Sequence, residues 1–322
     1  MRVLLLSDGF RSSLDDRTRV DFVKKLSNLC DFKIYGPGEY ASDQNLAPVL
    51  YSKKITYNDL KGFFNPDIVL FLLYKPDAYF TETEYIRALD TLTVIVEEDH
   101  YYEDEIYNGV NIFDWYKYTN FTLLLRRHFY EEESPIPSVW LPFSVNEKEF
   151  SVGDNINREN RIGFAGSYIG LKYYDIRRNA VKTLDNNNLL ASTWGKMYGD
   201  KYIDYLQKYV GTLTCSGSRL HTCLAKTFEI PLCGSALLTN HIHNTKELFG
   251  DKQCFFEYKD DCSDIIDVVN TIINDVDMRN EVISNVLEVV RKKHTDEKRI
   301  IELYNILQAV VDGKEPPRVW GQ

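Results

Sequence analysis

The segment that decides the fold of the C-terminal half is Lys226-Thr227-Phe228-Glu229-Ile230-Pro231-Leu232-Cys233-Gly234-Ser235-Ala236-Leu237-Leu238-Thr239. Its apolar spacing from Leu224 to Leu232 predicts a helix, Gly234 is typical of a residue that ends one, and Ala236 to Thr239 is typical of a short buried strand. We expect Glu229 in the last helical turn, near the carboxyl edge of a sheet. A carboxylate there can bind a polar ligand. It can also simply pair with Lys226 on the same helix face, a contact worth about 0.2–0.5 kcal/mol.

A glycine turn lies near the start of the same half. The short segment Ile162 to Ala165 predicts a buried strand, and the turn from Gly166 to Lys172 precedes a predicted helix, Asp175 to Leu184. Glycine lets backbone N–H groups approach a phosphate closely. The turn is therefore a candidate phosphate site, with a plain strand-to-helix connection as the alternative. A further strand is expected near residues 189–193.

The first half also alternates strands with helices. Its predicted strands are Val3 to Leu6, Phe32 to Tyr35, Asp67 to Leu73 and Leu92 to Glu97, with helices at 17–29, 58–64 and 82–89 between them. This order predicts an α/β fold with a Rossmann-like, doubly wound parallel sheet. Ligands of such sheets bind at the carboxyl ends of strands. Two loops satisfy that rule: residues 7–13, with Asp8, and residues 98–102, with Asp99 and His100.

The length of the chain predicts two domains. At 322 residues it exceeds the size at which a single hydrophobic core usually stops growing. We place an N-terminal domain at residues 1–145 and a C-terminal domain at residues 146–322. The segment from Pro135 to Val145 is the expected connection, because its prolines restrict the backbone.

Charge and composition narrow the function classes. Residues 1–150 hold 25 of the 48 acidic and 16 of the 38 basic residues, which leaves 23 and 22 for the rest. The acidic first half argues against nucleic acid or an anionic bilayer as partner. Short apolar runs predict no integral membrane segment and no signal peptide, hence a cytoplasmic protein. The six dispersed cysteines predict reduced thiols, and the His241–His243 pair lacks the further ligands of a zinc site, so we expect no metal.

Several motifs of the chain resemble one known family. The run KTFEIPLCGSALLTN from Lys226, KELF at 246–249, HTDEKR at 294–299, GFAGS at 163–167 and WLPFSV at 140–145 are similar to the CgeB-like glycosyltransferases. These belong to the group 1 glycosyltransferases, which use nucleotide-activated sugars. The resemblance is specific over about residues 138–307 and architectural before that. It implies a GT-B fold, in which two Rossmann-like domains face a central cleft and the last helix, about 295–311, packs back on the first domain.

The resemblance assigns a nucleoside site. The family has a glutamate at the position of Glu229, where it accepts hydrogen bonds from ribose hydroxyls, and a carboxylate with two acceptor oxygens suits this role. Its second glutamate, eight residues earlier, contacts the donor sugar, and this chain has His221 there. The identity of the sugar and the stereochemistry of transfer therefore stay open. A histidine without a functional role is an equal alternative for His221.

The resemblance also assigns a diphosphate site. Lys172 lies six residues after Gly166, where the wider family places a phosphate-binding lysine, and lysine serves well as a point charge on phosphate. Ser167 replaces the arginine that commonly follows the glycine. We therefore expect the charge to come from Lys172, with help from Lys226, Arg177 or Arg178, and we include Thr239 on the donor side.

For catalysis we select Asp99 and His100. A histidine beside a carboxylate can act as general base or orient an acceptor hydroxyl. Adjacent residues of a strand point to opposite faces, so at most one of the two faces the acceptor. Other acidic residues nearby are explained as a solvated rim, and Asp8 is a second candidate.

The predicted function is transfer of a sugar from a nucleotide-diphosphate donor to a hydroxyl of a glycan or glycosylated surface component. Retention of configuration follows from the resemblance. We expect no metal and no cofactor, because GT-B sites stabilise the leaving group with side chains and backbone dipoles. One alternative is a catalytically silent subunit that binds a nucleotide sugar or a partner glycosyltransferase, and another is a sugar-nucleotide epimerase. The sequence does not indicate the oligomeric state.

Overall fold

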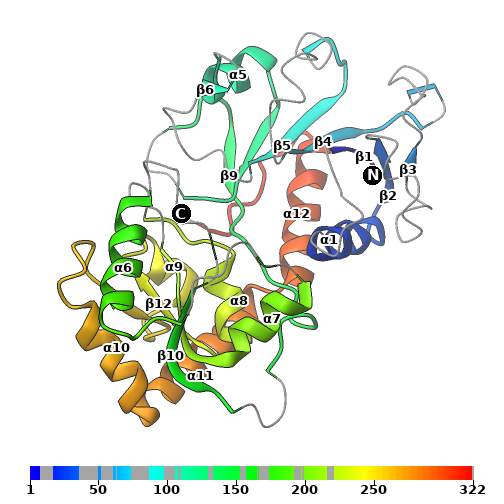
Figure 1. The fold of residues 1–322 in the computed structure, drawn as a ribbon. Coiled ribbons are helices and arrows are strands. Elements are labelled where there is room, and N and C mark those ends of the chain that lie inside the picture. Colours follow the sequence, from blue (N-terminus) through cyan, green and yellow to red (C-terminus); the bar gives the residue numbers. More distant parts are fainter. Residues whose placement is uncertain are drawn as a thin grey trace. The chain divides into compact units, whose positions relative to one another are not determined.

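The computed structural model describes residues 1–7, 17–35, 50–51, 61–62, 64–73, 87–97, 106–107, 110–129, 133–152, 157–164, 166, 174–191, 197, 199–215 and 221–320 (Figure 1). The chain forms two compact units. The first unit consists of Met1–Pro142 and Arg299–Gln322, and the second unit is Phe143–Lys298. No helix within the described ranges is long and apolar enough to cross a membrane.

The first unit is built on a parallel sheet of seven strands in the order β3-β2-β1-β4-β5-β8-β9. Near-continuous apolar runs form its central strands, as expected for parallel strands that are covered on both faces. A separate antiparallel pair joins β6 (Ile106–Tyr107) to β7 (Val110–Asn111). The strands of the main sheet are β1 (Arg2–Ser7), β2 (Asp31–Tyr35), β3 (Leu50–Tyr51), β4 (Ile68–Leu73), β5 (Leu92–Glu97), β8 (Leu123–Arg126) and β9 (Ser138–Trp140).

Helices cover both faces of this sheet. Val3 and Leu5 of β1 pack in one core with α1 (Arg17–Ser27) and with the part of α12 (Asp296–Val311) that belongs to this unit. Leu4 and Leu6 pack in a second core with α5 (Ile112–Thr119). The alternation follows from the two-residue period of a strand. Helix α12 supplies four buried side chains to the first core: Ile300, Leu303, Ile306 and Leu307.

The second unit has a parallel sheet of four strands in the order β10-β11-β12-β13. Leu190 pairs with Ile162 of β10 in an additional parallel bridge, whereas β11 pairs with the same strand through Gly211. The strands are β10 (Glu159–Phe164), β11 (Tyr209–Leu213), β12 (Ala236–Asn240) and β13 (Phe256–Tyr258); the helices are α6 (Asp175–Asn186), α7 (Gly199–Lys208), α8 (Lys226–Leu232), α9 (Thr245–Phe249), α10 (Ile265–Asn274) and α11 (Val276–Lys293).

The order of connections places a topological switch point at the end of β10. The chain leaves β10, first pairs with it at Leu190, and then returns through α7 to pair through β11. Crevices at such a point, at the carboxyl ends of the strands, are where open α/β sheets bind ligands. The two parallel sheets with helices between their strands confirm the predicted fold class.

The structure refines the predicted helix around Glu229. Helix α8 begins at Lys226 and has only seven residues, so Glu229 is its fourth residue and belongs to both its first and its last turn. The helix starts two residues later than the predicted Leu224, whose carbonyl nevertheless accepts a hydrogen bond from the N–H of Thr227 at 3.0 Å. A crossover helix starts at the carboxyl edge of a parallel sheet, so a first-turn residue lies closer to that edge. The predicted end at Gly234 is confirmed, with φ of +71°.

Candidate functional site

Gly166, directly after β10, lies against the side chain of Lys226. A Cβ atom built on this glycine would come within 3.0 Å of Lys226 Nζ and 3.6 Å of the Phe164 ring. The amine of Lys226 in α8 therefore lies directly beside Gly166. Glycine at this position leaves room beside the amine, and a larger side chain would compete for that space.

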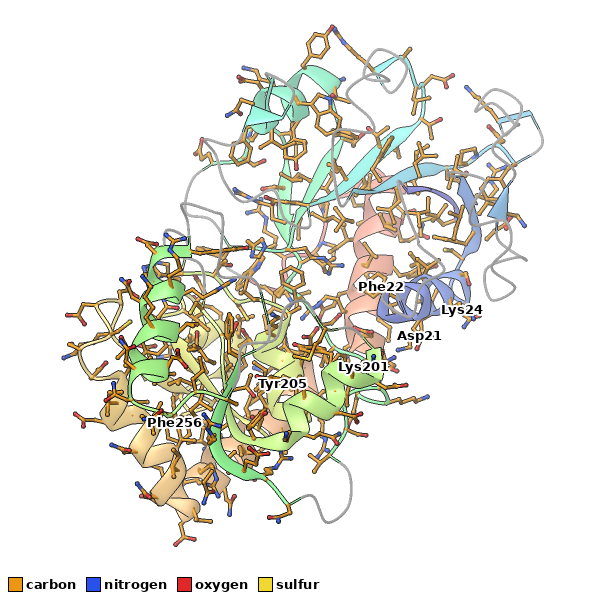
Figure 2. The ribbon with its side chains drawn as sticks, viewed as in Figure 1. Asp21, Phe22, Lys24, Lys201, Tyr205 and Phe256 are labelled. Atoms are coloured by element: carbon orange, nitrogen blue, oxygen red, sulfur yellow. The ribbon has the colours of Figure 1, made fainter. Side chains whose placement is uncertain are left out.

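Tyr205 of α7 fixes the end of β10 (Figure 2). Its hydroxyl accepts a hydrogen bond from the N–H of Phe164 at 2.9 Å and donates one to the carbonyl of the same residue at 3.1 Å. Burial raises the pKa of Tyr205 to about 12. One side chain thus occupies both backbone groups of the residue two positions before Gly166, which fixes the last residue of β10.

A second cation lies near Lys226. Arg177, in the first turns of α6, donates from Nη2 to the carbonyl oxygen of Cys215 at 3.3 Å, directly beyond the end of β11. Burial and, to a smaller extent, the charge of Arg177 lower the pKa of the Lys226 amine to about 8, while Glu229 opposes both effects. Two cations held this closely repel each other. An anion between them would relieve the repulsion.

Glu229 lies on the same helix as Lys226, one turn later. Its Oε2 accepts a hydrogen bond from the hydroxyl of Tyr202 at 2.9 Å, and Tyr202 comes from α7. Burial raises the pKa of the Glu229 carboxyl, whereas the Tyr202 hydrogen bond and Lys226 lower it. Two oxygens give a carboxylate about four acceptor positions. One bond from Tyr202 therefore orients the group and leaves acceptor capacity for the hydroxyls of a ligand.

Cys215 and Tyr258 form a buried polar contact near Lys226 and Arg177. The thiol Sγ of Cys215 and the hydroxyl of Tyr258 are 2.9 Å apart at the ends of β11 and β13. Both residues are almost fully buried, and burial raises the pKa of both groups. A buried neutral thiol is a poor nucleophile, so Cys215 contributes packing and polarity here.

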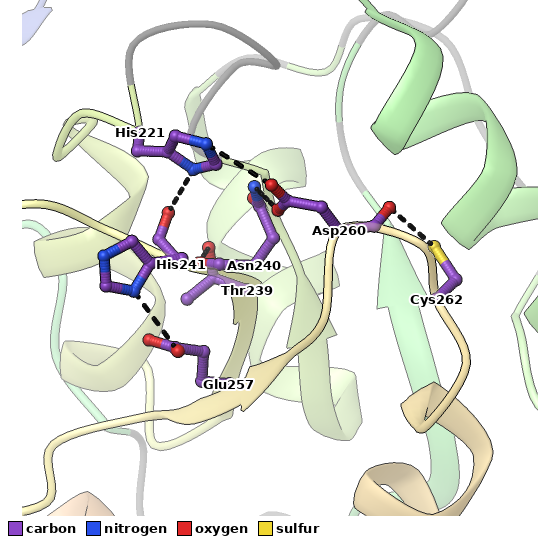
Figure 3. A network of polar contacts seen from close by, with 7 residues as sticks. All are labelled: His221, Thr239, Asn240, His241, Glu257, Asp260 and Cys262. Atoms are coloured by element: carbon purple, nitrogen blue, oxygen red, sulfur yellow. Dashed lines mark hydrogen bonds and ion pairs between the residues drawn. The ribbon is translucent and has the colours of Figure 1, made fainter.

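His221 is held by a polar network beside the sheet edge (Figure 3). Its Nδ1 is 3.1 Å from the carbonyl of His241, and its Nε2 is 3.3 Å from Oδ2 of Asp260. The backbone of His221 is left-handed, with φ of +43°, and its carbonyl accepts a hydrogen bond from the N–H of His243. Both ring nitrogens thus contact protein atoms, which gives His221 a role in anchoring the segment that leads into α8.

The histidines around His221 lie close together without forming a metal site. Ring centroids of His221, His241 and His243 are 5.1 to 5.7 Å apart, and His241 Nδ1 is 3.3 Å from Glu257. Among the residues that the structure describes, no group of three or more histidine, cysteine or acidic side chains is arranged to hold a metal ion. Thr239 is fully buried in β12, and its hydroxyl donates to the carbonyl of Asn240.

The structure thus brings together part of the predicted site. Gly166, Lys226 and Glu229 gather at the switch point of the second unit, and His221 lies at the edge near β12. Arg177 lies near them and is one of the two arginines that the sequence predicted as a source of positive charge. Asp99, His100, Ser167 and Lys172 lie outside the described residues.

Other contributors carry no local sequence signal. Tyr202 lies 27 residues before Glu229, and Asp260 lies 39 residues after His221, so only the folded chain shows these contacts. The amphipathic pattern of α7 predicts which helix face is buried, and it does not identify the tyrosine that reaches a carboxylate.

Residues 176–305 match the model of a family described as glycosyl transferase-like. No curated protein sequence matches the chain significantly.

Three solved structures are similar over nearly the whole chain. HepE of Anabaena in complex with UDP-glucose has a TM-score of 0.67 and 10% identity and covers 96% of this chain and 100% of its own. Sucrose-phosphate synthase from Thermosynechococcus elongatus has a TM-score of 0.63 and 9% identity, with coverage of 98% and 100%. A DNA-modifying β-glucosyltransferase has a TM-score of 0.64 and 12% identity, with coverage of 97% and 100%.

The similarity to these structures shows the fold, which is the GT-B fold of glycosyltransferases. The family match assigns glycosyltransferase-like sequence to the part of the second unit that holds Arg177, Lys226 and Glu229.

Proposed function

We propose that the protein transfers a sugar from a nucleotide-diphosphate donor to a hydroxyl group of a glycan or glycosylated surface component. The observation that carries this proposal is the arrangement at the switch point. The amine of Lys226 lies over Gly166 with Arg177 nearby, and Glu229 lies one helical turn beyond the amine. A charged diphosphate and a ribose with two hydroxyls present groups that complement these cations and this carboxylate.

The two cations suit the leaving group of the reaction. Cleavage of the sugar–phosphate bond leaves additional negative charge on the diphosphate, and preorganised positive groups stabilise that charge where it develops. Lys226 and Arg177 are held in place before the ligand arrives, by burial and by the bond from Arg177 to Cys215. This stabilisation by side chains supports our proposal that transfer proceeds without a metal ion.

Glu229 suits the nucleoside. Oriented by Tyr202, its carboxylate can accept hydrogen bonds from both ribose hydroxyls, which is the role that the resemblance to the CgeB-like family implies. The neighbours named above include one complex with UDP-glucose, so uridine diphosphate and its glucose conjugate are the first donors to test. We also propose a retaining mechanism on the resemblance, and we keep Asp99 and His100 as the proposed residues that position the acceptor hydroxyl.

Calorimetric titration with UDP and GDP tests the donor site. We expect Glu229→Ala to weaken binding of the preferred nucleotide by about 10- to 150-fold, because a hydrogen bond to a charged group contributes about 1.5–3 kcal/mol. Glu247→Ala is the matched control, since this residue is an exposed acid on α9 of the same unit. Equal affinity of wild type and Glu229→Ala would remove Glu229 from the site.

Turnover separates an enzyme from a silent binding subunit. Wild-type protein is incubated with UDP-sugars and GDP-sugars, with and without simple sugar acceptors, and free nucleotide is measured. Release that depends on an acceptor supports the transferase. Tight binding without release under every condition would contradict it and favour the silent subunit, and interconversion of donors without an acceptor would favour an epimerase.

A further inference from the structure

A pocket of about 600 Å³ lies within the first unit, beside the edge strand β9. Three segments line it: the end of β8 with the residues that follow, residues 133–140, and the C-terminal segment with Arg318 and Trp320. All of them belong to the first unit. The volume falls in the range of about 300–1,000 Å³ that is usual for small-ligand sites.

Aromatic rings form one part of the wall. Phe129 and Trp140 meet edge to face, with ring centroids 5.0 Å apart. The indole N–H of Trp140 donates to the carbonyl of Arg127 at 3.3 Å, which fixes the ring plane. Trp140 and Trp320 are each 9% exposed, whereas Phe129 is partly exposed. The exposed part of these fixed rings offers apolar surface at small entropic cost to a ligand.

The C-terminal wall is fixed by contacts inside the same unit. Trp320 donates from its indole N–H to Oε2 of Glu302 at 3.1 Å, and the guanidinium of Arg299 lies 5.1 Å from its ring centroid. Arg299 is fully buried and also bonds to Glu302. Helix α12 therefore holds Trp320 against the pocket, and the wall is preorganised.

The charged groups of the pocket are balanced. Arg126 has its Nε 3.9 Å from a carboxylate oxygen of Glu97, and Arg318 has its Nε 3.8 Å from Glu315. Glu133 adds a further acid to the lining. A phosphate site would need an excess of positive charge, which these partners cancel. The pocket therefore combines aromatic side chains with planar polar side chains that can donate or accept hydrogen bonds.

We propose that this pocket binds a saccharide. The C–H face of a pyranose ring would stack on the aromatic wall, and its hydroxyls would exchange hydrogen bonds with Arg318 on one side and Glu133 on the other. The identification of this saccharide as part of the acceptor rests on the proposed function, whereas the binding itself does not.

Saturation-transfer NMR with the full chain tests the inference. The probes are maltotriose, cellotriose and chitotriose at up to about 10 mM, a range that covers the millimolar dissociation constants of weak ligands. We expect transfer to ring protons of at least one probe, together with a change in tryptophan fluorescence from Trp140 and Trp320. We expect Arg318→Ala and Glu133→Ala each to weaken binding about tenfold, and both side chains are exposed, so folding should persist.

Lys314→Ala is the matched control, because it removes an exposed cation from the same C-terminal segment and Lys314 does not line the pocket. Absence of transfer to every probe would overturn the inference, and so would binding that is unchanged in both pocket variants. UDP affinity is measured by calorimetry on the same samples. Loss of UDP binding with saccharide binding retained would count against the proposed function alone, and the reverse would count against the pocket alone.

Discussion

The two units share one architecture and treat buried charge in opposite ways. In the first unit, Glu97 and Arg126 stand opposite each other in the register of β5 and β8, and both are buried as an ion pair at the ends of these strands. In the second unit, Lys226 and Arg177 are like charges near the end of β10. A charge that already has its counterion gains little from an anionic ligand. Like charges near each other gain more from an added anion, which supports the proposal that the second sheet binds a diphosphate.

The largest effect is expected where the pair is broken. Glu97→Gln leaves the guanidinium of Arg126 buried without its counterion, which should destabilise the first unit by about 3 kcal/mol or more. Urea denaturation followed by circular dichroism and by tryptophan fluorescence measures the loss. Asp90→Asn is the control, because it removes the acid of the exposed pair with Lys61 and should change little. A similar shift in both variants would show that burial does not distinguish the Glu97–Arg126 pair.

A smaller effect of opposite sign is expected in the second unit. Lys226→Met removes a cation that Arg177 repels, so the free protein should be as stable as wild type or more stable, while UDP affinity should fall by about 10- to 150-fold. Thermal denaturation and calorimetry measure the two quantities on the same samples. Lys246→Ala, an exposed lysine on α9, serves as control. Lower stability together with unchanged affinity would assign Lys226 a structural role only.

The smallest predicted effect is the uptake of a proton by Lys226 when UDP binds. The pKa of Lys226 is lowered to about 8 from its ordinary 10.5, so this group destabilises the folded chain below about pH 8. Between the two values the unfolded chain binds more protons, and the destabilisation decreases as pH rises. A diphosphate beside the amine raises its pKa again, so UDP binding above about pH 8 should take up a proton. Calorimetry at about pH 8.5 in buffers of different ionisation enthalpy measures that uptake. Lys226→Met should show none, and equal uptake in the variant would place the proton on another group.

The sequence predicted the strands and helix ends of the two units better than the side-chain contacts between distant residues. Apolar runs such as Ile68–Leu73 predicted strands because a parallel sheet buries both faces, and Gly234 predicted a helix end because few residues accept a positive φ. The start of α8 was predicted two residues early, since apolar spacing alone does not show where a helix begins. Contacts between distant residues, such as Tyr202 with Glu229 or Glu97 with Arg126, depend on which strands become neighbours. That information lies in the topology and not in any local pattern.

Because most of α12 belongs to the first unit, the two units cannot complete their folding in the order in which they are synthesised. The second unit is one uninterrupted stretch of chain, Phe143–Lys298, and can close its core as soon as that stretch has left the ribosome. The first unit is synthesised first but cannot complete its hydrophobic core until α12 has been made, because this core includes Ile300, Leu303, Ile306 and Leu307. Until they arrive, apolar surface around β1 and α1 stays open to solvent. A chain that stops before α12 would therefore fail to fold its first unit, although the strands of that unit's main sheet had already been synthesised.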